Sequence, residues 1–210
     1  LTRERARSLM EAGVDLLNVD LESLEKEVYE SIRIGLSHEI VLKNIFGLFE
    51  ERDAMDANTA ISILFIEQET NTNETEAFLA HFSNYIRPEK GDYIRVFPMH
   101  NYGGFGVDGI TPSNIPCYSL YTSLNVLKDG QVALCCVDED CEFEMGDVND
   151  RTVTEIFNAD SFTRFRKLHE AGGRWVSKKC GQCNVPEVAG AQRIYGAGGE
   201  PFPNSGAKCS

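Results

Sequence analysis

The chain has 210 residues, 42% of them hydrophobic, and a formal net charge of −13 from 20 basic and 33 acidic side chains. This acidic balance argues against nucleic acid or an anionic membrane surface as a principal partner. No apolar run approaches the roughly 18 residues that a membrane span needs, and no signal peptide is visible. We therefore expect a cytoplasmic protein with one ordinary domain and one small one.

The first hundred residues alternate between helix and strand patterns. The expected elements, in order, are a helix ending at Gly13, a strand over 14–21, helices over about 23–33 and 37–53, a strand over 59–66, a helix carrying Phe78, Phe82 and Tyr85, and a strand over 93–98. Helices that alternate with buried strands predict parallel α/β units. Three such units are too few to close a barrel by themselves.

The composition changes after residue 98, where glycines accumulate between Gly103 and Gly109 and prolines stand at 112 and 116. This predicts a linker over 101–116. Further on, Thr152 and Glu155 are spaced as a capping box, and we expect Ser161 to cap the following helix. The Gly/Pro/Ser-rich residues 196–210 predict a flexible tail.

Four of the seven cysteines form two half-sites, Cys117 with Cys135 and Cys180 with Cys183. Four thiolates can close a tetrahedral site for zinc or hold an iron–sulfur cluster, so spacing alone leaves the metal open. In an apparently cytosolic chain this arrangement favours a metal centre over disulfides.

A β-hairpin is expected inside the first half-site, because apolar-rich segments flank Asp129-Gly130. A two-residue loop would pair Lys128 with Gln131 and therefore Leu124 with Cys135. Cys117 would then lie roughly 20 Å upstream of Leu124 if the chain were extended. If both cysteines bind one centre, residues 116–122 must fold back as a turn or a short helix.

This region resembles the SPASM domain, a C-terminal extension of radical S-adenosylmethionine (radical SAM) enzymes. The resemblance rests on several motifs in the family's order. They are Cys-x12-Gly-x4-Cys, Cys135-Cys136-Val137-Asp138, Met145-Gly146-Asp147-Val148-Asn149, Thr154-Glu155-Ile156-Phe157, Phe165-Arg166-Lys167-Leu168-His169 and Cys180-x-x-Cys183. The resemblance implies one auxiliary [4Fe–4S] cluster bound by Cys117, Cys135, Cys180 and Cys183. Two-cluster members have further cysteines where this chain has Ala189 and Arg193, so we expect a single cluster.

The first hundred residues resemble the second half of the radical SAM partial barrel. Asn18-Val19-Asp20 is similar to the end of the fourth strand, the segment 29–35 to the stretch after that strand, and His100-Asn101-Tyr102-Gly103-Gly104 to a motif that precedes many SPASM domains. The Cys-x3-Cys-x2-Cys triplet of the radical-generating cluster is absent, and so is the Gly-Gly-Glu-type loop. We therefore interpret the chain as a C-terminal fragment of a radical SAM enzyme.

The expected fold class is α/β, with the second half of a partial (β/α)6 TIM-like barrel over 1–100. The linker over 101–116 is followed by a small α+β SPASM domain over 117–195, made of a β-hairpin and short helices, and by the tail over 196–210.

For the intact protein, the resemblance implies S-adenosylmethionine, a second [4Fe–4S] cluster, and a 5′-deoxyadenosyl radical that abstracts hydrogen from a peptide or carbohydrate. The auxiliary cluster would accept an electron or help to bind the substrate, and a flavodoxin or ferredoxin would be the reductant. Two other classes stay open, a non-catalytic electron-transfer or binding module and a zinc-stapled structural domain.

Four further residues are candidates for the SAM or substrate side of the site: Asn18, Asp20, His100 and Asp138. Asn18 and Asp20 would share a face at the end of a strand, but they could also only close the strand. His100 is more typical of a hydrogen-bonding residue at a strand end than of a catalytic one. Asp138 could support the metal site, contact substrate, or be an exposed acid in the run that continues through Glu142. Cys136 is expected to be buried filler. Cys141 fits neither half-site, and Cys209 lies in the tail.

Overall fold

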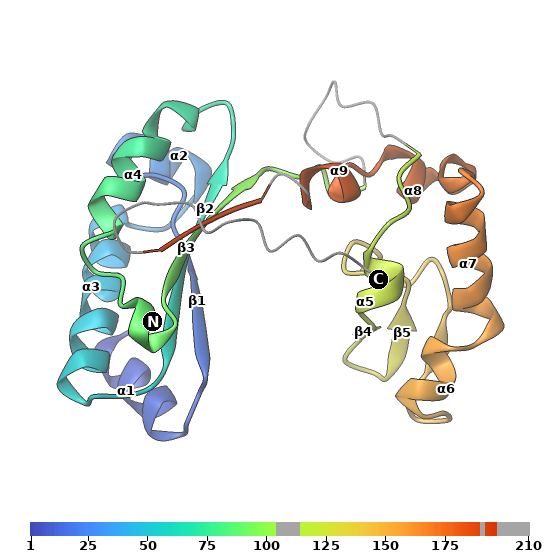
Figure 1. The fold of residues 1–210 in the computed structure, drawn as a ribbon, viewed down its shortest axis with the longest axis horizontal. Helices are drawn as coiled ribbons and strands as arrows, with labels where there is room; N and C mark the ends of the chain where they lie inside the picture. The colour runs from blue at the N-terminus through green and yellow to red at the C-terminus, as the bar shows by residue number, and fades with distance from the viewer. Residues whose placement is uncertain (104–113, 190–191, 197–210) are drawn as a thin grey trace. The chain divides into compact units, whose positions relative to one another are not determined.

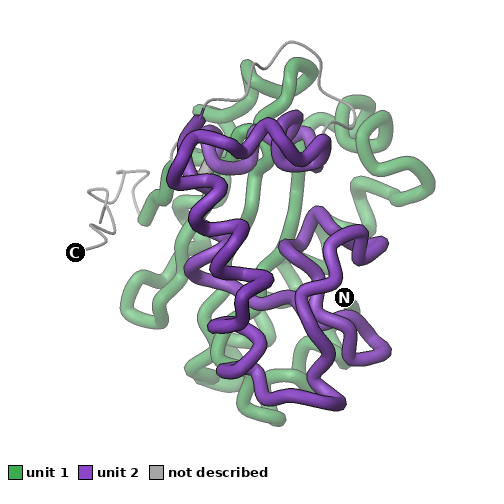
Figure 2. Tube along the Cα trace, turned by 90° about the vertical axis from the view of Figure 1, so that its right-hand side faces the viewer, with its two compact units in different colours: residues 1–99, 191–210 green, residues 100–190 purple. Residues whose placement is uncertain are grey.

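The structure, a computed structural model, describes residues 1–103, 114–189 and 192–196. The chain divides into two compact units, residues 1–99 with 191–210 and residues 100–190 (Figure 2). No helix in the described ranges is long and apolar enough to cross a membrane.

The first unit contains a four-stranded sheet in the order β1-β2-β3-β7 (Figure 1). Its strands are β1 (Leu16–Asp20), β2 (Ala60–Glu67), β3 (Tyr93–Pro98) and β7 (Arg193–Tyr195). The first three are parallel, as the alternating pattern predicts, and β7 is antiparallel to β3. The α-helices are α1 (Arg3–Glu11), α2 (Lys26–Ile32), α3 (His38–Ala54) and α4 (Thr75–Phe82), with two 3₁₀ turns, η1 (Thr72–Glu74) and η2 (Pro88–Lys90). This confirms a mixed α/β fold.

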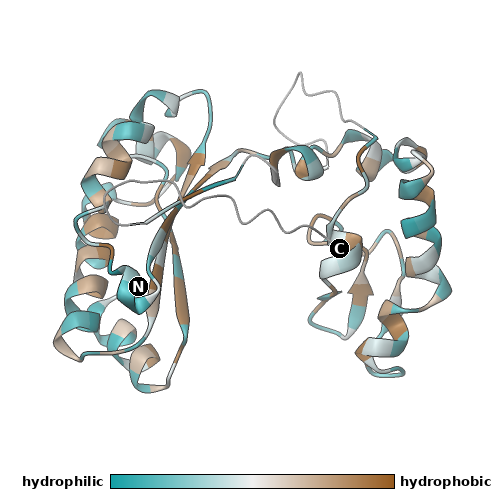
Figure 3. Cartoon of the chain, in the orientation of Figure 1, coloured by the Kyte–Doolittle hydropathy of each residue, from teal (hydrophilic) through white to brown (hydrophobic). Residues whose placement is uncertain are grey.

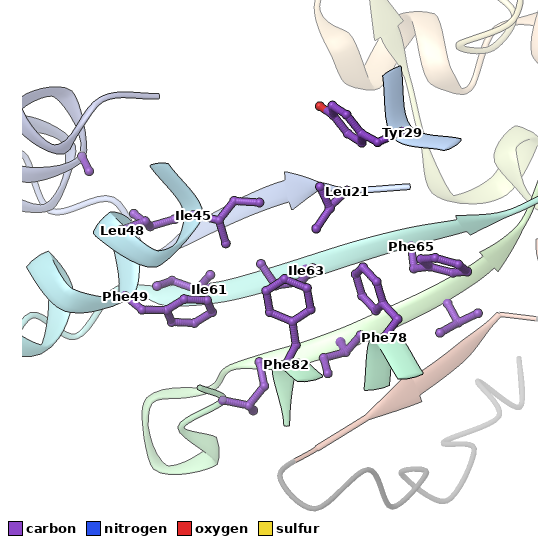
Figure 4. Close-up of a cluster of buried hydrophobic side chains, with 14 of the residues drawn as sticks. Leu21, Tyr29, Ile45, Leu48, Phe49, Ile61, Ile63, Phe65, Phe78 and Phe82 are labelled. Carbon is purple, nitrogen blue, oxygen red and sulfur yellow. The ribbon is translucent and has the colours of Figure 1, made fainter. Parts of the chain in front are cut away.

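One face of this sheet carries the core, because α1, α3 and α4 lie along it (Figure 1). Hydrophobic residues run along the central strands (Figure 3). Alternate residues of β2 and β3 are fully buried against Leu48 and Phe82 of the helices (Figure 4). The strand residues are Ile61, Ile63, Phe65, Ile94 and Val96. Their period of two places the intervening residues on the opposite face.

A buried ion pair fixes one part of this core. The side chains of Arg52 on α3 and Asp92 before β3 are both fully buried, and Nη1 of Arg52 donates to the carboxylate at 2.8 Å. Asp92 also accepts the backbone N–H groups of Ile61 and Arg87. The charge of Asp92 is thus compensated by a guanidinium and two amides, as burial of a carboxylate requires.

The second unit holds a small antiparallel sheet in the order β4-β5-β6, surrounded by short helices. Its strands are β4 (Asn125–Val126), β5 (Gln131–Ala133) and β6 (Gly146–Asp147). Its helices are α5 (Ser119–Thr122), α6 (Val153–Phe157), α7 (Asp160–Glu170), α8 (Lys178–Gln182) and α9 (Val185–Ala189), with the 3₁₀ turn η3 (Arg174–Val176). A separate core of Leu120, Val132, Leu134, Met145, Ile156 and Phe162 holds the unit together.

The hairpin exists, but its predicted register is wrong by one residue. Val126 pairs with Val132, and the N–H of Leu127 donates to the carbonyl of Gln131, so the loop has three residues instead of two. Gly130 has a φ of +97° and follows a turn closed by its N–H to the carbonyl of Leu127. This is the three-residue type I turn with a left-handed glycine, which the Asp-Gly pair also permits.

Other local predictions are mostly confirmed. The capping box at Thr152 and Glu155 is present, and Gly13 and Gly172 adopt left-handed φ values just after α1 and α7. Ser161 does not cap α7, because the helix begins one residue earlier, and its hydroxyl donates to the carbonyl of Met145. Tyr85 lies beyond the end of α4.

The predicted linker and tail fall largely on residues 104–113 and 197–210, outside the described ranges. Arg193–Tyr195, which the sequence interpretation assigned to the SPASM domain, lie in the first unit's sheet.

Candidate metal centre

The four cysteines of the two predicted half-sites line one cavity of the second unit. The cavity has about 380 Å³ of space free of protein atoms, counting its open mouth. Its wall also contains apolar side chains, among them Leu134, Val137, Phe143 and Pro186. The structure thus brings Cys117, Cys135, Cys180 and Cys183 together from segments far apart in the sequence.

Cys117 reaches the cavity because the chain folds back immediately after it, as the spacing requires. The turn closes with Leu120 N–H donating to the carbonyl of Cys117 at 3.3 Å, and α5 follows. Leu120 then anchors α5 in the unit's core. The backbone N–H of Cys117 donates to Nδ1 of His169 on α7 at 3.2 Å. This bond ties the backbone of Cys117 to α7.

Cys135 follows β5 and is held by the loop that comes after it. Asp138, whose exposed fraction is only 1%, accepts the backbone N–H groups of Leu134 at 3.2 Å, Glu142 at 3.0 Å and Phe143 at 3.3 Å. Asp138 is therefore not an exposed loop acid. Its carboxylate orders the turn that carries Cys135 and borders the same cavity.

Cys180 and Cys183 lie on and just beyond α8, where a buried arginine binds their backbone. Ser177 caps the helix by accepting the N–H of Cys180. Nε of Arg174 donates to the carbonyl of Cys180 at 2.9 Å, and Nη2 donates to that of Cys183. Nη1 donates to the carbonyl of Ile115 at 3.2 Å and pairs with Glu187 at 3.1 Å. Arg174 thus connects the Cys180-x-x-Cys183 loop to the segment that leads into Cys117.

Lys179 connects the two half-sites electrostatically. Its ammonium contacts Asp138 at 2.9 Å, Glu142 at 3.4 Å and also Asp140. Burial by itself lowers the pKa of Lys179, but its hydrogen bonds to Asp140 and Asp138 outweigh this and raise the pKa overall. The acidic run is therefore more than a solvated surface, since it holds α8 against the loop after Cys135.

Three of these thiols are harder to ionise than a free cysteine: Cys135, Cys180 and Cys183. Burial raises the pKa of Cys135 to about 12, and it also raises the pKa values of Cys180 and Cys183. In the described ranges no three His, Cys, Asp or Glu side chains converge on a point that could hold a single metal ion. A cubane cluster does not need that convergence, because each thiolate binds a different iron.

We expect the iron-free protein to lose stability as the pH rises above about 8.5. The Cys135 thiol ionises near that pH in the unfolded chain, whereas the folded chain retains the proton to a pH of about 12. The folded state then binds more protons, so the free energy of unfolding falls by up to about 1.4 kcal/mol per pH unit for this thiol. Urea unfolding of the parent and of Cys135→Ala at pH 7.5 and 9.5 would measure it. An equal decrease in both proteins would contradict this assignment.

Of the other cysteines in the described ranges, neither Cys136 nor Cys141 lines the cavity. Cys136 is exposed, so the prediction that it is buried filler is wrong, because the chain leaves the strand at Cys135 and turns into the Asp138 loop. Cys141 has a φ of +51°, and its Sγ lies 3.7 Å from the carbonyl of Val132. Cys209 lies outside the described residues.

The other predicted site residues lie elsewhere. Asn18 and Asp20 share the exposed face of β1, opposite the core, and Asp20 lies 3.6 Å from Arg33. The ring of His100 contacts that of Tyr102 at a tilt of 51°, with centroids 3.9 Å apart, and burial lowers the pKa of His100. None of these three is among the residues that line the cysteine cavity.

Three contributors to the centre had no assigned role in the sequence interpretation: His169, Arg174 and Lys179. His169 was part of a quoted motif but was given no function. Arg174 and Lys179 follow no spacing rule, because what they bind is the carbonyls and carboxylates of a folded loop. A basic residue next to Cys180 was the only available signal.

Comparison with known proteins matches the segment that contains the four cysteines. A family model described as SPASM, iron-sulfur cluster-binding domain, matches residues 117–184. A curated relative, the S-adenosyl-L-methionine-dependent 2-deoxy-scyllo-inosamine dehydrogenase of Niallia circulans, is 28% identical over 92 residues. These residues are 43% of this chain and 37% of that protein, so the match spans little more than a third of the relative's length.

A solved structure, BtrN in complex with AdoMet and 2-DOIA, aligns with a TM-score of 0.42. It is 18% identical and covers 87% of this chain and 76% of that chain. A likeness at this score supports no conclusion about the site.

Residues 117–184 are thus an iron–sulfur cluster-binding domain of the SPASM family. Over the matched 92 residues the chain is also similar to part of an S-adenosyl-L-methionine-dependent dehydrogenase.

Proposed function

We propose that the second unit binds one [4Fe–4S] cluster through Cys117, Cys135, Cys180 and Cys183, and that this is the auxiliary cluster of a radical SAM enzyme. The observation that carries the proposal is the meeting of both half-sites in one cavity. The donor set fits, because four thiols converging in one cavity suit an iron–sulfur cluster. When bound, such a cluster supplies a one-electron acceptor or a point of attachment for substrate.

The chain's own residues prepare this cavity. Arg174 and Asp138 use their hydrogen bonds to hold the backbone on either side of the cysteines. Leu134, Val137 and Phe143 limit the access of water to the thiols. The buried guanidinium also places a positive charge beside a centre that becomes anionic when the thiolates bind metal.

For the substrate we favour a carbohydrate-like polyol over a peptide, and an oxidation over other outcomes. The support is the name of the relative, a dehydrogenase of an aminocyclitol, over the matched 92 residues. In this proposal the first unit is the second half of a partial (β/α)6 barrel within a longer protein. Asn18 and Asp20 would then serve the SAM or substrate side of the first unit, and a flavodoxin or ferredoxin would be the reductant.

The test of the cluster assignment is the composition of anaerobically purified protein. We expect about four irons and four acid-labile sulfides per chain, and an electron paramagnetic resonance (EPR) signal after reduction by one electron. Stoichiometric zinc without labile sulfide would instead support the zinc-stapled structural domain. If redox partner proteins reduce and reoxidise the loaded cluster in the absence of any substrate, the result would favour an electron-transfer module.

A further inference from the structure

One side chain in the wall of the cysteine cavity is neither a predicted ligand nor fully hydrogen-bonded. His169, near the end of α7, is 1% exposed and lines the cavity together with all four thiols. Imidazole has one nitrogen on each side of the ring, so a buried histidine normally needs two partners. Within the described residues, His169 has one.

The one hydrogen bond that His169 makes determines its tautomer. Nδ1 lies 3.2 Å from the backbone nitrogen of Cys117, which can only donate. Nδ1 must therefore be unprotonated, and the ring proton of the neutral imidazole is on Nε2.

The Nε2–H group is buried and has no hydrogen-bond partner in the part of the chain that the structure describes. Leaving such a donor unpaired in a buried position is destabilising. The cavity that His169 borders is also lined by cysteine sulfurs, apolar side chains, Arg174, Lys179 and Asp138. The Asp138 carboxylate is already bonded to three backbone N–H groups and to Lys179. An acceptor that enters with the bound group would remove this cost.

We propose that Nε2–H of His169 donates a hydrogen bond to a sulfur of the bound cluster, either a cysteine thiolate or an inorganic sulfide. His169 is then a positioning residue that also tunes the cluster and not one of its ligands. This inference rests on the proposed function. Because reduction adds negative charge to the cluster, a donor to sulfur stabilises the reduced form and raises the reduction potential.

Two substitutions separate this role from simple support of Cys117. In His169→Asn the amide oxygen lies where Nδ1 was and can still accept the Cys117 N–H, but nothing reaches the position of Nε2. In His169→Gln the longer side chain restores a donor near the position of Nε2. His81→Gln, at an exposed position of α4 in the first unit, is the matched control.

The readout is the midpoint potential from EPR-monitored redox titration of the loaded protein. At the parent's midpoint, we expect the ratio of reduced to oxidised cluster to fall about tenfold in His169→Asn, a shift of about 59 mV for one electron. His169→Gln and His81→Gln should stay near the parent. An unshifted Asn variant, or a Gln variant shifted as far as the Asn variant, would overturn the proposal.

A measurement on the parent covers the case in which a variant fails to load. With ¹⁵N-histidine and exchange into D₂O, pulsed EPR of the reduced cluster should show a weakly coupled nitrogen and an exchangeable deuteron. If neither couples, the hydrogen bond is absent; a strong nitrogen coupling would make His169 a ligand instead. A parent protein that contains no iron and sulfide would contradict the proposed function itself. A loaded parent whose midpoint potential does not change when His169 is replaced would contradict only the role of His169.

Discussion

Replacing any one of Cys117, Cys135, Cys180 and Cys183 by Ser is expected to remove most of the iron and to lower resistance to protease. Each thiolate would bind one iron corner, so a missing ligand opens that corner to water and oxidation. The half-sites come from the turn before α5, the loop after β5, and α8, and the cluster would cross-link all three. Loading should therefore further stabilise the folded unit.

The measurement is iron per chain after anaerobic purification, together with the rate of limited proteolysis. Cys136→Ser, Cys141→Ser and Cys209→Ser are the matched controls and should remain near the parent. Cys136 is the sharpest of these, because it is adjacent to Cys135 yet exposed. If Cys141→Ser lost its iron while Cys117→Ser retained it, a different four of the seven cysteines would be the ligands.

Substitution of Arg174 by Gln should have the second large effect, although the residue is no ligand. The guanidinium is 2% exposed and binds three backbone carbonyls and the carboxylate of Glu187. Removing one partner of a buried charged network costs about 3–5 kcal/mol. We expect this loss in the free energy of unfolding, and a loaded cluster that decays several-fold faster on exposure to air.

Arg174→Lys separates charge from geometry in the same experiment. Lysine keeps the positive charge but cannot donate in the fork that reaches the carbonyls of Cys180 and Cys183 at once. It should therefore recover only part of the stability. Arg164→Gln, on the exposed side of α7, is the control and should change neither quantity. Equal stability of Arg174→Gln and the parent would show that the network does not support the loop.

The elements that sequence could predict are those set by local periodicity and capping. The box at Thr152 follows from spacing within a few residues, and the parallel strands follow from the alternation of helix and strand patterns. The return of the chain after Cys117 was inferred instead from the condition that Cys117 and Cys135 bind one centre. The hairpin register was missed because Asp129-Gly130 fits both a two-residue and a three-residue loop, and packing decides between them. Cys136 was misjudged because strand alternation stops at the Asp138 turn.

The ligands of the centre were predicted through a family pattern, whereas the side chains that hold them were not. Arg174 and Lys179 bind backbone carbonyls and carboxylates that converge only after folding. Nε2 of His169 is notable because it has no hydrogen-bond partner in the described residues. Sequence spacing cannot predict a missing partner. At these positions the sequence gives the residue type but not the groups that it contacts in the folded chain.

The pairing of β7 with β3 makes the cluster unit an insertion whose two ends are anchored to one sheet. Arg193 pairs with Val96 across that edge and also contacts Glu67 on β2. If the unit unfolds on losing its metal, its roughly 90 residues remain a closed loop, and holding the ends costs about 4 kcal/mol of chain entropy. The pairing of β7, a strand of only three residues, has to offset this cost. Loss of metal would thus favour dissociation of β7 from β3. The edge of β3 would then be exposed to pairing with other chains.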